Sequence, residues 1–393
     1  MVVGLNKKII TPGHGLIVDT FIMYGFVRTV LQGEGGDKRL ANTQIKPEGE
    51  YFILEINEKD IYEIERSFYR NLHDAYASEV DRARSGKYRR VAAFQKEEEI
   101  FDELRGFLRY IVLTSGKLPE IFEIFPSPLT WGEWRSNRCK KHSRMFGAIS
   151  ELKGLLKDYT AHIPLSPYLG KYLFEFDKGV DQKQQKLCPL CASLAILGLL
   201  SYSVRMVLMG QGAGWQFVTI IPTKAVSGRD ISLFNQAFGK DTLITPPQFI
   251  TKMPEIITPL LLFKDTDTSI LEILLQSSPM LFAYRFEPRP HSQVLLVRKV
   301  SEYPATRFIE FYLKVREKSS NLDKRLLDRM KFMEYSPFFA ELALAILTKD
   351  FGHFYNFLRG FSTETAKDHY VSKDGKPVLF SNGFVEQALR FFK

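Results

Sequence analysis

An uncharged segment from Leu187 to Val204 constrains the fold more than any other part of the chain. The segment is about as long as the shortest membrane-spanning helices, so it must lie either in a bilayer or in the core of a folded domain. It contains Pro189, Gly198 and three serines, and Arg205 follows it directly. This composition favours a buried helix entered from a turn, and we therefore expect no membrane partner.

Periodic segments on both sides of this stretch indicate a chain that mixes helices with strands. Apolar side chains surround nearly the whole segment from Gly15 to Leu31, which predicts a second buried helix. Strand-forming residues dominate four further segments, which are Tyr51–Ile56, Gln216–Pro222, Met280–Phe286 and Gln293–Val300. After Pro304 the pattern is helical apart from a short turn at residues 373–376. We predict an α+β fold, with a mixed helix/strand N-terminal body at residues 1–300 and a mainly helical C-terminal lobe at residues 301–393.

Composition and cysteine content limit the class of protein. With 45% hydrophobic and 25% charged residues, the chain of 393 residues has the composition of a globular protein and is long enough for two domains. Three cysteines are too few for a disulfide framework. The first residues, Met1–Lys8, show no signal-peptide pattern. These features predict a cytoplasmic protein.

All three cysteines belong to one candidate metal site. Cys139 and His142 form a CxxH pair, and Cys188 and Cys191 form a CxxC pair. The gap of two residues lets a tight turn direct both side chains at one tetrahedral ion, so we expect one structural zinc in a zinc-ribbon-like insertion at about residues 131–195. Two alternatives stay open. Cys188 and Cys191 can be small core residues of the buried helix, or a redox-active CxxC, which the adjoining hydrophobic helix disfavours.

The net charge of +9 favours a polyanionic partner such as nucleic acid. Two clusters of basic side chains have aromatic residues within or beside them, with Tyr88 inside the first, and this combination suits phosphate neutralisation and base stacking. The first cluster consists of Arg82, Arg84, Lys87, Arg89 and Arg90. The second consists of Trp131, Trp134, Arg135, Arg138, Lys140 and Lys141. We predict that both contact nucleic acid; the alternative is a solvated face, which we favour for a third basic region, Arg298–Lys331.

Sequence motifs of catalysis are missing. The chain has no GxxxxGK[ST] nucleotide-binding loop, no HExxH and no GxSxG. Its glycine-rich turn, Gly210–Gly214, precedes a predicted strand, whereas a phosphate-binding loop would lead into a helix. We therefore expect no nucleotide cofactor and no enzymatic activity. The alternative is a metal-dependent nuclease or another nucleic-acid-processing enzyme, whose carboxylates would have to converge on a metal in the fold.

Three stretches together resemble a known family. The motif Gly13–Asp19 (GHGLIVD), running into Tyr24–Arg28 (YGFVR), is similar to the N-terminal motif of the large subunit of archaeal type I-A CRISPR interference (Cascade) complexes. The CPLC motif at Cys188 before an apolar helix and the Phe-rich helical end also fit that family. The CxxH pair departs from the paired CxxC of some relatives.

The resemblance implies a function and partners. Such a large subunit recognises the protospacer-adjacent motif, grips target DNA and stabilises the R-loop, while guide pairing supplies sequence specificity. The implied partners are crRNA-bearing backbone subunits, target DNA and a separate helicase-nuclease that cuts the DNA. We expect the same non-catalytic, DNA- and RNA-binding role in antiviral defence for this chain.

Overall fold

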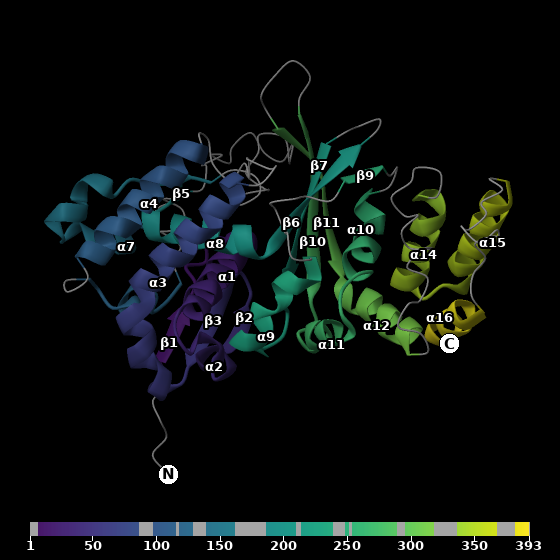
Figure 1. Cartoon of the computed structure of the whole chain (residues 1–393), viewed down its shortest axis with the longest axis horizontal. Helices are drawn as coiled ribbons and strands as arrows, with labels where there is room; N and C mark the ends of the chain where they lie inside the picture. Colours follow the sequence, from purple (N-terminus) through teal and green to yellow (C-terminus); the bar gives the residue numbers. More distant parts are fainter. Residues whose placement is uncertain are drawn as a thin grey trace, which may run out of the picture. The chain divides into compact units, whose positions relative to one another are not determined.

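The computed structural model describes most of the chain (Figure 1). The described residues are 7–85, 97–114, 118–128, 139–161, 186–209, 214–238, 248–250, 254–288, 295–317, 336–367 and 382–392. They form two compact units. The first contains the described residues up to Ser203 together with Pro222–Asn235, and the second contains Val204–Ile221, Gln236–Phe238 and the described residues from Gln248 onward.

The centre of the first unit is a pair of buried helices, α1 (Leu16–Gln32) and α8 (Pro189–Ser201). Every residue of α8 is buried, which confirms the helix predicted from the uncharged segment. None of the helices in the described ranges has an apolar stretch of the length that a bilayer crossing needs. The two helices approach each other at Gly25 and Gly198, where a side chain would overlap the backbone of the facing helix.

A four-stranded antiparallel sheet packs beside α1 in the order β1-β3-β2-β8. Its strands are β1 (Lys7–Ile10), β2 (Gln44–Glu48), β3 (Tyr51–Ile56) and β8 (Val226–Ser227). β3 confirms the predicted strand, and its burial alternates so that Phe52, Leu54 and Ile56 face the core. The pairing of β8 with β2 brings a late part of the chain into this unit.

The remaining elements of the first unit are mostly helices. The long helix α3 buries Ile64, Phe68 and Leu72 at helical spacing, and it packs on α4. Two short strands, β4 and β5, form an antiparallel pair. The bounds are α2 (Gly36–Ala41), α3 (Glu58–Ser85), α4 (Glu97–Leu113), α5 (Ile121–Ile124), α7 (Lys140–Gly147), η2 (Ser150–Leu155), β4 (Tyr159–Thr160), β5 (Lys186–Leu187) and α9 (Gly228–Ser232).

The second unit joins a five-stranded sheet, in the order β11-β10-β7-β6-β9, to a set of helices. The strands are β6 (Ser203–Met209), β7 (Gly214–Ile221), β9 (Gln248–Ile250), β10 (Met280–Pro288) and β11 (Leu295–Pro304). The helices are η3 (Phe234–Phe238), α10 (Pro254–Phe263), α11 (Thr268–Gln276), α12 (Ala305–Arg316), α14 (Ser336–Thr348), α15 (Phe351–Lys367) and α16 (Asn382–Phe392). Phe311 of α12 lies against Phe384 and Phe391 of α16, so aromatic side chains hold the C-terminal helices together.

The predicted α+β class is confirmed, because both units combine helices with a sheet. The sheet of the first unit is antiparallel, whereas the sheet of the second unit contains the antiparallel pairs β10–β11 and β10–β7 and the parallel pair β6–β9. The domain boundary expected near residue 300 coincides with the interior of β11, which pairs with β10 from Leu295 to Pro304. The first compact unit extends to Ser203 and also includes Pro222–Asn235 from later in the chain. The separate helical lobe expected at residues 301–393 stays a prediction.

Candidate metal centre and nucleic-acid surface

The four predicted metal-binding residues come together at the N-terminal ends of two helices. Cys139 directly precedes α7 and His142 lies in its first turn. Cys188 is the N-cap of α8 and Cys191 lies in its first turn, with Pro189 at the first helical position. Both pairs therefore begin helices, and in the described residues neither pair lies on the β-turns of a ribbon. The strand pair β4–β5 ends next to Cys188, because Leu187 of β5 pairs with Tyr159 of β4.

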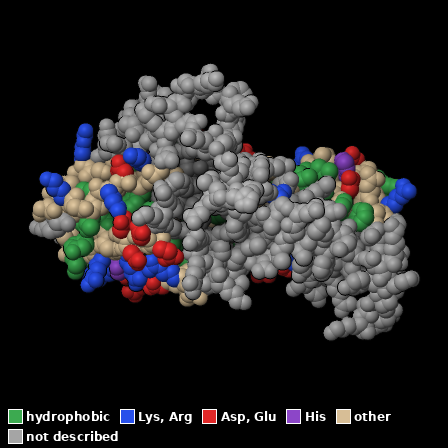
Figure 2. Space-filling view, turned by 90° about the horizontal axis from the view of Figure 1, so that it is seen from above, with side chains coloured by type: hydrophobic (Ala, Val, Ile, Leu, Met, Phe, Trp, Pro, Cys, Tyr) green, Lys and Arg blue, Asp and Glu red, His purple; other side chains and the backbone are tan. Residues whose placement is uncertain are grey.

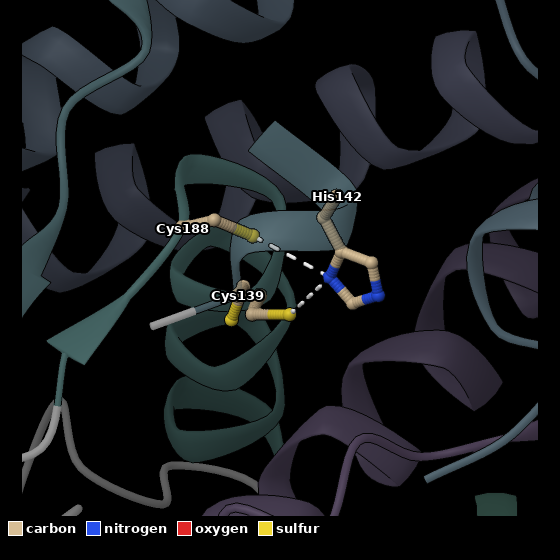
Figure 3. A group of neighbouring side chains, drawn as sticks. Cys139, His142 and Cys188 are labelled. Carbon is tan, nitrogen blue, oxygen red and sulfur yellow. Dashed lines mark hydrogen bonds between the residues drawn. The ribbon is translucent and has the colours of Figure 1, made fainter. Parts of the chain in front are cut away.

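The distances within the cluster fit a tetrahedral ion. The ligand atoms of Cys139, His142, Cys188 and Cys191 all lie within 4.8 Å of one another. His142 Nδ1 lies 3.7 Å from Cys188 Sγ and 3.4 Å from Cys191 Sγ. Figure 3 shows the imidazole of His142 directed at the sulfur of Cys188. Ordinary zinc–sulfur and zinc–nitrogen bonds at a tetrahedral angle place the two ligand atoms about 3.6 Å apart. The cluster therefore has the donor set and the spacing for one zinc ion.

The buried position of this cluster makes negatively charged thiolates unfavourable unless a cation compensates them. All four residues are buried, and burial raises the pKa of the Cys139 and Cys191 thiols well above the ordinary value. Burial would also raise the pKa of Cys188, but hydrogen bonds from Cys139, Cys191 and His142 hold it well below the ordinary value. Burial therefore disfavours the thiolate forms of Cys139 and Cys191. A divalent ion would compensate further thiolates and remove the penalty of burying them.

Sequence reasoning missed a fifth residue at this cluster. His14, from the loop before α1, places its Nε2 atom 3.0 Å from Cys139 Sγ. Burial lowers the pKa of His14 to about 4, so the imidazole is neutral at neutral pH. Nothing in the spacing of the cysteines points to a residue so far upstream, although GHG in the N-terminal motif is conspicuous in the sequence.

The loop that carries His14 is held by a buried carboxylate. Asp19 Oδ1 accepts a hydrogen bond of 2.8 Å from the backbone N–H of Gly13. The flanking residues Gly13 and Gly15 have φ angles of 80° and 117°, which favour glycine. Arg28 does not pair with Asp19; its Nε lies 3.2 Å from Glu79 Oε1. Asp19 is therefore a structural residue of the loop.

Few residues of the two predicted basic clusters fall in the described part of the chain. Arg82 and Arg84 lie at the end of α3. Arg84 binds Glu98 Oε2 at 3.0 Å and Asp102 Oδ1 at 2.9 Å, and Arg82 binds Glu79 Oε2 at 2.6 Å. The backbone of α7 carries Lys140 and Lys141. The other predicted residues, Lys87, Arg89, Arg90, Trp131, Trp134, Arg135 and Arg138, lie outside the described residues.

A different set of exposed side chains on α3 combines an aromatic ring with two arginines. Tyr62, Arg66 and Arg70 follow one another at intervals of four residues, so they lie along one side of the helix. All three are exposed, Tyr62 by 68%. Within the described residues, neither arginine has a carboxylate at ion-pair distance. We call this set the α3 stripe; the four-residue spacing was its signal in the sequence.

Acidic side chains accompany the basic ones over the described surface. Figure 2 shows blue and red side chains interspersed in that view, without a large region of one sign. Much of the charge is paired locally, as in Arg105 with Asp81 at 2.9 Å and Lys157 with Glu103 at 2.5 Å. Unpaired arginines such as those of the α3 stripe are therefore the basic groups most available to a phosphate backbone.

The cluster residues lie in a region that matches known proteins. A family model described as "CRISPR-associated protein (Cas_Csa4)" matches residues 129–372, which is more than half of the chain and includes all four cluster residues. A protein of Thermoproteus tenax described as "CRISPR system associated protein Cas8" is 26% identical over 241 residues. The match covers 59% of this chain and 63% of the relative, so the chain spans less than two thirds of that protein's length.

Proposed function

This chain belongs to the Cas_Csa4 family of CRISPR-associated proteins, and we propose that it is the non-catalytic large subunit of a type I-A RNA-guided interference complex. In this role it binds target DNA, recognises the protospacer-adjacent motif and stabilises the R-loop. The family match is the observation that carries the proposal, and it confirms the resemblance to CRISPR interference subunits predicted from the sequence.

The charge and the α3 stripe support a nucleic-acid-binding role. A chain with a net charge of +9 attracts polyanions over a distance set by the salt concentration. Arg66 and Arg70 can neutralise phosphates, and the exposed ring of Tyr62 can stack on an unpaired base. Sequence specificity then comes from the guide RNA, so the protein needs to read only a short motif and to hold the backbone.

The chemistry of the metal cluster supports a structural ion over a catalytic one. A hydrolytic zinc site keeps one position open for water, whereas four protein ligands close the coordination shell. Cys139, His142, Cys188 and Cys191 supply four ligands and are all buried. A bound zinc would supply a cross-link between the start of α7 and the start of α8. We propose that zinc has this role, and that cutting belongs to a separate helicase-nuclease.

Reconstitution of the assembly tests the proposed function. We would mix the purified chain with crRNA-loaded backbone subunits and measure R-loop formation on duplexes that carry or lack the adjacent motif. We expect R-loops only with this chain present, and faster on motif-bearing DNA. R-loop formation that is equally fast without the chain would contradict the proposal.

The alternative of a nuclease is tested separately. Labelled target DNA is mixed with an excess of this chain and with magnesium or manganese, and no other subunit is added. If the chain is a nuclease, it cleaves the DNA in a single turnover. We expect intact DNA from the chain alone and cleavage only after the helicase-nuclease is added. Cleavage by the chain that is lost with a carboxylate variant would establish the enzyme alternative.

A further inference from the structure

The contact between His14 and Cys139 joins the N-terminal motif to the metal cluster. His14 Nε2 and Cys139 Sγ are 3.0 Å apart, and both residues are buried. A neutral imidazole carries one N–H and one bare nitrogen, and a thiolate only accepts hydrogen bonds. With Cys139 as a thiolate on an ion, the contact is favourable when the proton of His14 is on Nε2.

The geometry of the loop fixes the position of the imidazole. Asp19 accepts the N–H of Gly13, the residue before His14, and Asp19 itself is rigid because it lies in the first turn of the buried helix α1. The positive φ angles of Gly13 and Gly15 turn the chain sharply on both sides of His14. The side chain therefore projects towards Cys139 from a backbone that has little freedom to move.

We propose that His14 is a positioning residue of the metal centre, whose Nε2–H donates a hydrogen bond to the Cys139 thiolate and orients it for the ion. The inference rests on the metal centre proposed above. The hydrogen bond withdraws charge from the sulfur, which protects Cys139 from electrophiles. The same hydrogen bond links binding of the ion to the conformation of the GHG loop. Because Asp19 holds this loop, the link extends to helix α1. Groups that orient a metal ligand in this way commonly contribute about 10–100-fold in metal affinity.

Two substitutions separate the hydrogen bond from the volume of the ring. His14→Phe keeps a ring and removes the N–H, whereas His14→Gln retains an amide N–H within reach of the Nε2 position. In cobalt-substituted protein, loss of a hydrogen bond to sulfur moves the sulfur-to-cobalt charge-transfer band to longer wavelength. We expect this shift in His14→Phe and a position close to wild type in His14→Gln. Transfer of zinc to a chelator should be about 10–100-fold faster in His14→Phe and restored towards wild type in His14→Gln.

A matched control and a measurement on unaltered protein complete the test. His73 is a partly exposed histidine on α3 that contacts Asp74, so His73→Phe should leave both the cobalt spectrum and zinc transfer unchanged. In wild-type protein labelled with ¹⁵N-histidine, the nitrogen shifts of His14 should report a proton on Nε2, which needs no variant to fold. Assignment follows from the signal that disappears in His14→Gln.

The outcomes distinguish this inference from the metal centre itself. Wild-type protein that binds zinc or cobalt, while His14→Phe has the same spectrum and the same transfer rate, would overturn the role of His14 and leave the metal centre standing. A proton on Nδ1 of His14 would have the same consequence. Wild-type protein that binds neither ion would overturn both.

Discussion

Gly25 of α1 and Gly198 of α8 face each other at closest approach: a Cβ atom on Gly198 would lie 2.9 Å from the backbone nitrogen of Gly25 and 2.0 Å from the carbonyl oxygen of Phe21. A Cβ on Gly25 would likewise lie 2.0 Å from the carbonyl oxygen of Leu194. These overlaps involve backbone, which cannot rotate away as a flexible side chain can. The pair of glycines therefore sets the distance between the two helices at the centre of the first unit.

Replacing Gly198 by alanine should destabilise the protein. The added methyl group must push α1 and α8 apart, and overpacking of this kind costs about 1–3 kcal/mol or more. The measurement is the free energy of unfolding in urea. Gly106→Ala in α4 is the matched control, because no atom lies within 4 Å of the added Cβ and alanine favours the helix by about 0.5–1 kcal/mol. Equal effects of the two substitutions would contradict the close packing at Gly198.

Replacing Cys191 by serine should lower metal content and thermal stability together. Wild-type protein is expected to contain about one zinc per chain. Metal content and stability should fall together, because metal binding and folding are coupled in structural sites. Metal content is measured by elemental analysis and stability by thermal unfolding. Addition of a chelator to wild-type protein should reproduce the loss of stability, and the chelator should have little effect on Cys191→Ser. A metal-free wild-type protein with undiminished stability would rule out the zinc.

The stability of the protein should depend on Asp19 in a defined pH window. Burial is the main cause that raises its pKa to about 7, and the side chain is inaccessible to solvent. Between the ordinary pKa of aspartate and pH 7 the unfolded chain releases this proton while the folded protein retains it. The contribution of Asp19 to stability is therefore present at low pH and is lost as the pH rises through this window.

The variant Asp19→Asn tests this dependence because it cannot ionise and still offers an oxygen to the Gly13 N–H. Relative to wild type, its free energy of unfolding should increase from about pH 5 to about pH 7.5, by on the order of a few kcal/mol. Urea unfolding of both proteins at each pH cancels the other titrating groups. A difference that is constant with pH would show that Asp19 ionises normally in the folded state.

Replacing Arg66 and Arg70 together by alanine should weaken DNA binding about equally for all sequences. Each phosphate contact contributes about one unit to the slope of log affinity against log salt, so the slope should flatten by about 2. Arg105→Ala is the matched control on the adjoining helix, because both terminal nitrogens of Arg105 already bind Asp81, at 2.9 and 3.1 Å. An unchanged slope in the double variant would place the DNA path elsewhere, with the predicted clusters around Arg89 and Trp131 as the next to be replaced.

The parts of the fold that follow from local pattern were predictable. The uncharged segment predicted α8, because a buried helix rarely holds an unpaired charge. The alternating pattern in Tyr51–Ile56 predicted β3, because side chains point to alternate faces along a strand. The strands β1 and β2 were not predicted, since Lys7, Lys8 and Pro47 lie in them. Their pairing with β3 determines these strands, and pairing partners are not visible in a local pattern.

The candidate site shows the same division between local and distant information. The gaps of two residues identified Cys139, His142, Cys188 and Cys191. A gap of this size is informative because a single turn of the chain can direct both side chains at one ion. His14 was missed because its place beside Cys139, 125 residues further along the chain, depends on tertiary packing that no local spacing shows. Arg84 looked available for phosphate because its partners Glu98 and Asp102 come from the next helix. Whether residues 301–393 fold as a separate lobe stays a prediction.

The packing of α1 against α8 also has a consequence for synthesis on the ribosome. Residues 33–188 lie between the two helices in the chain, so α1 is made long before the helix that covers it. At ordinary rates of translation the interval is roughly 8–30 seconds. During this time an apolar helix is exposed on the nascent chain without its partner, which makes it a natural substrate for chaperones that bind hydrophobic segments. The core between α1 and α8 can therefore form only after α8 has been synthesised.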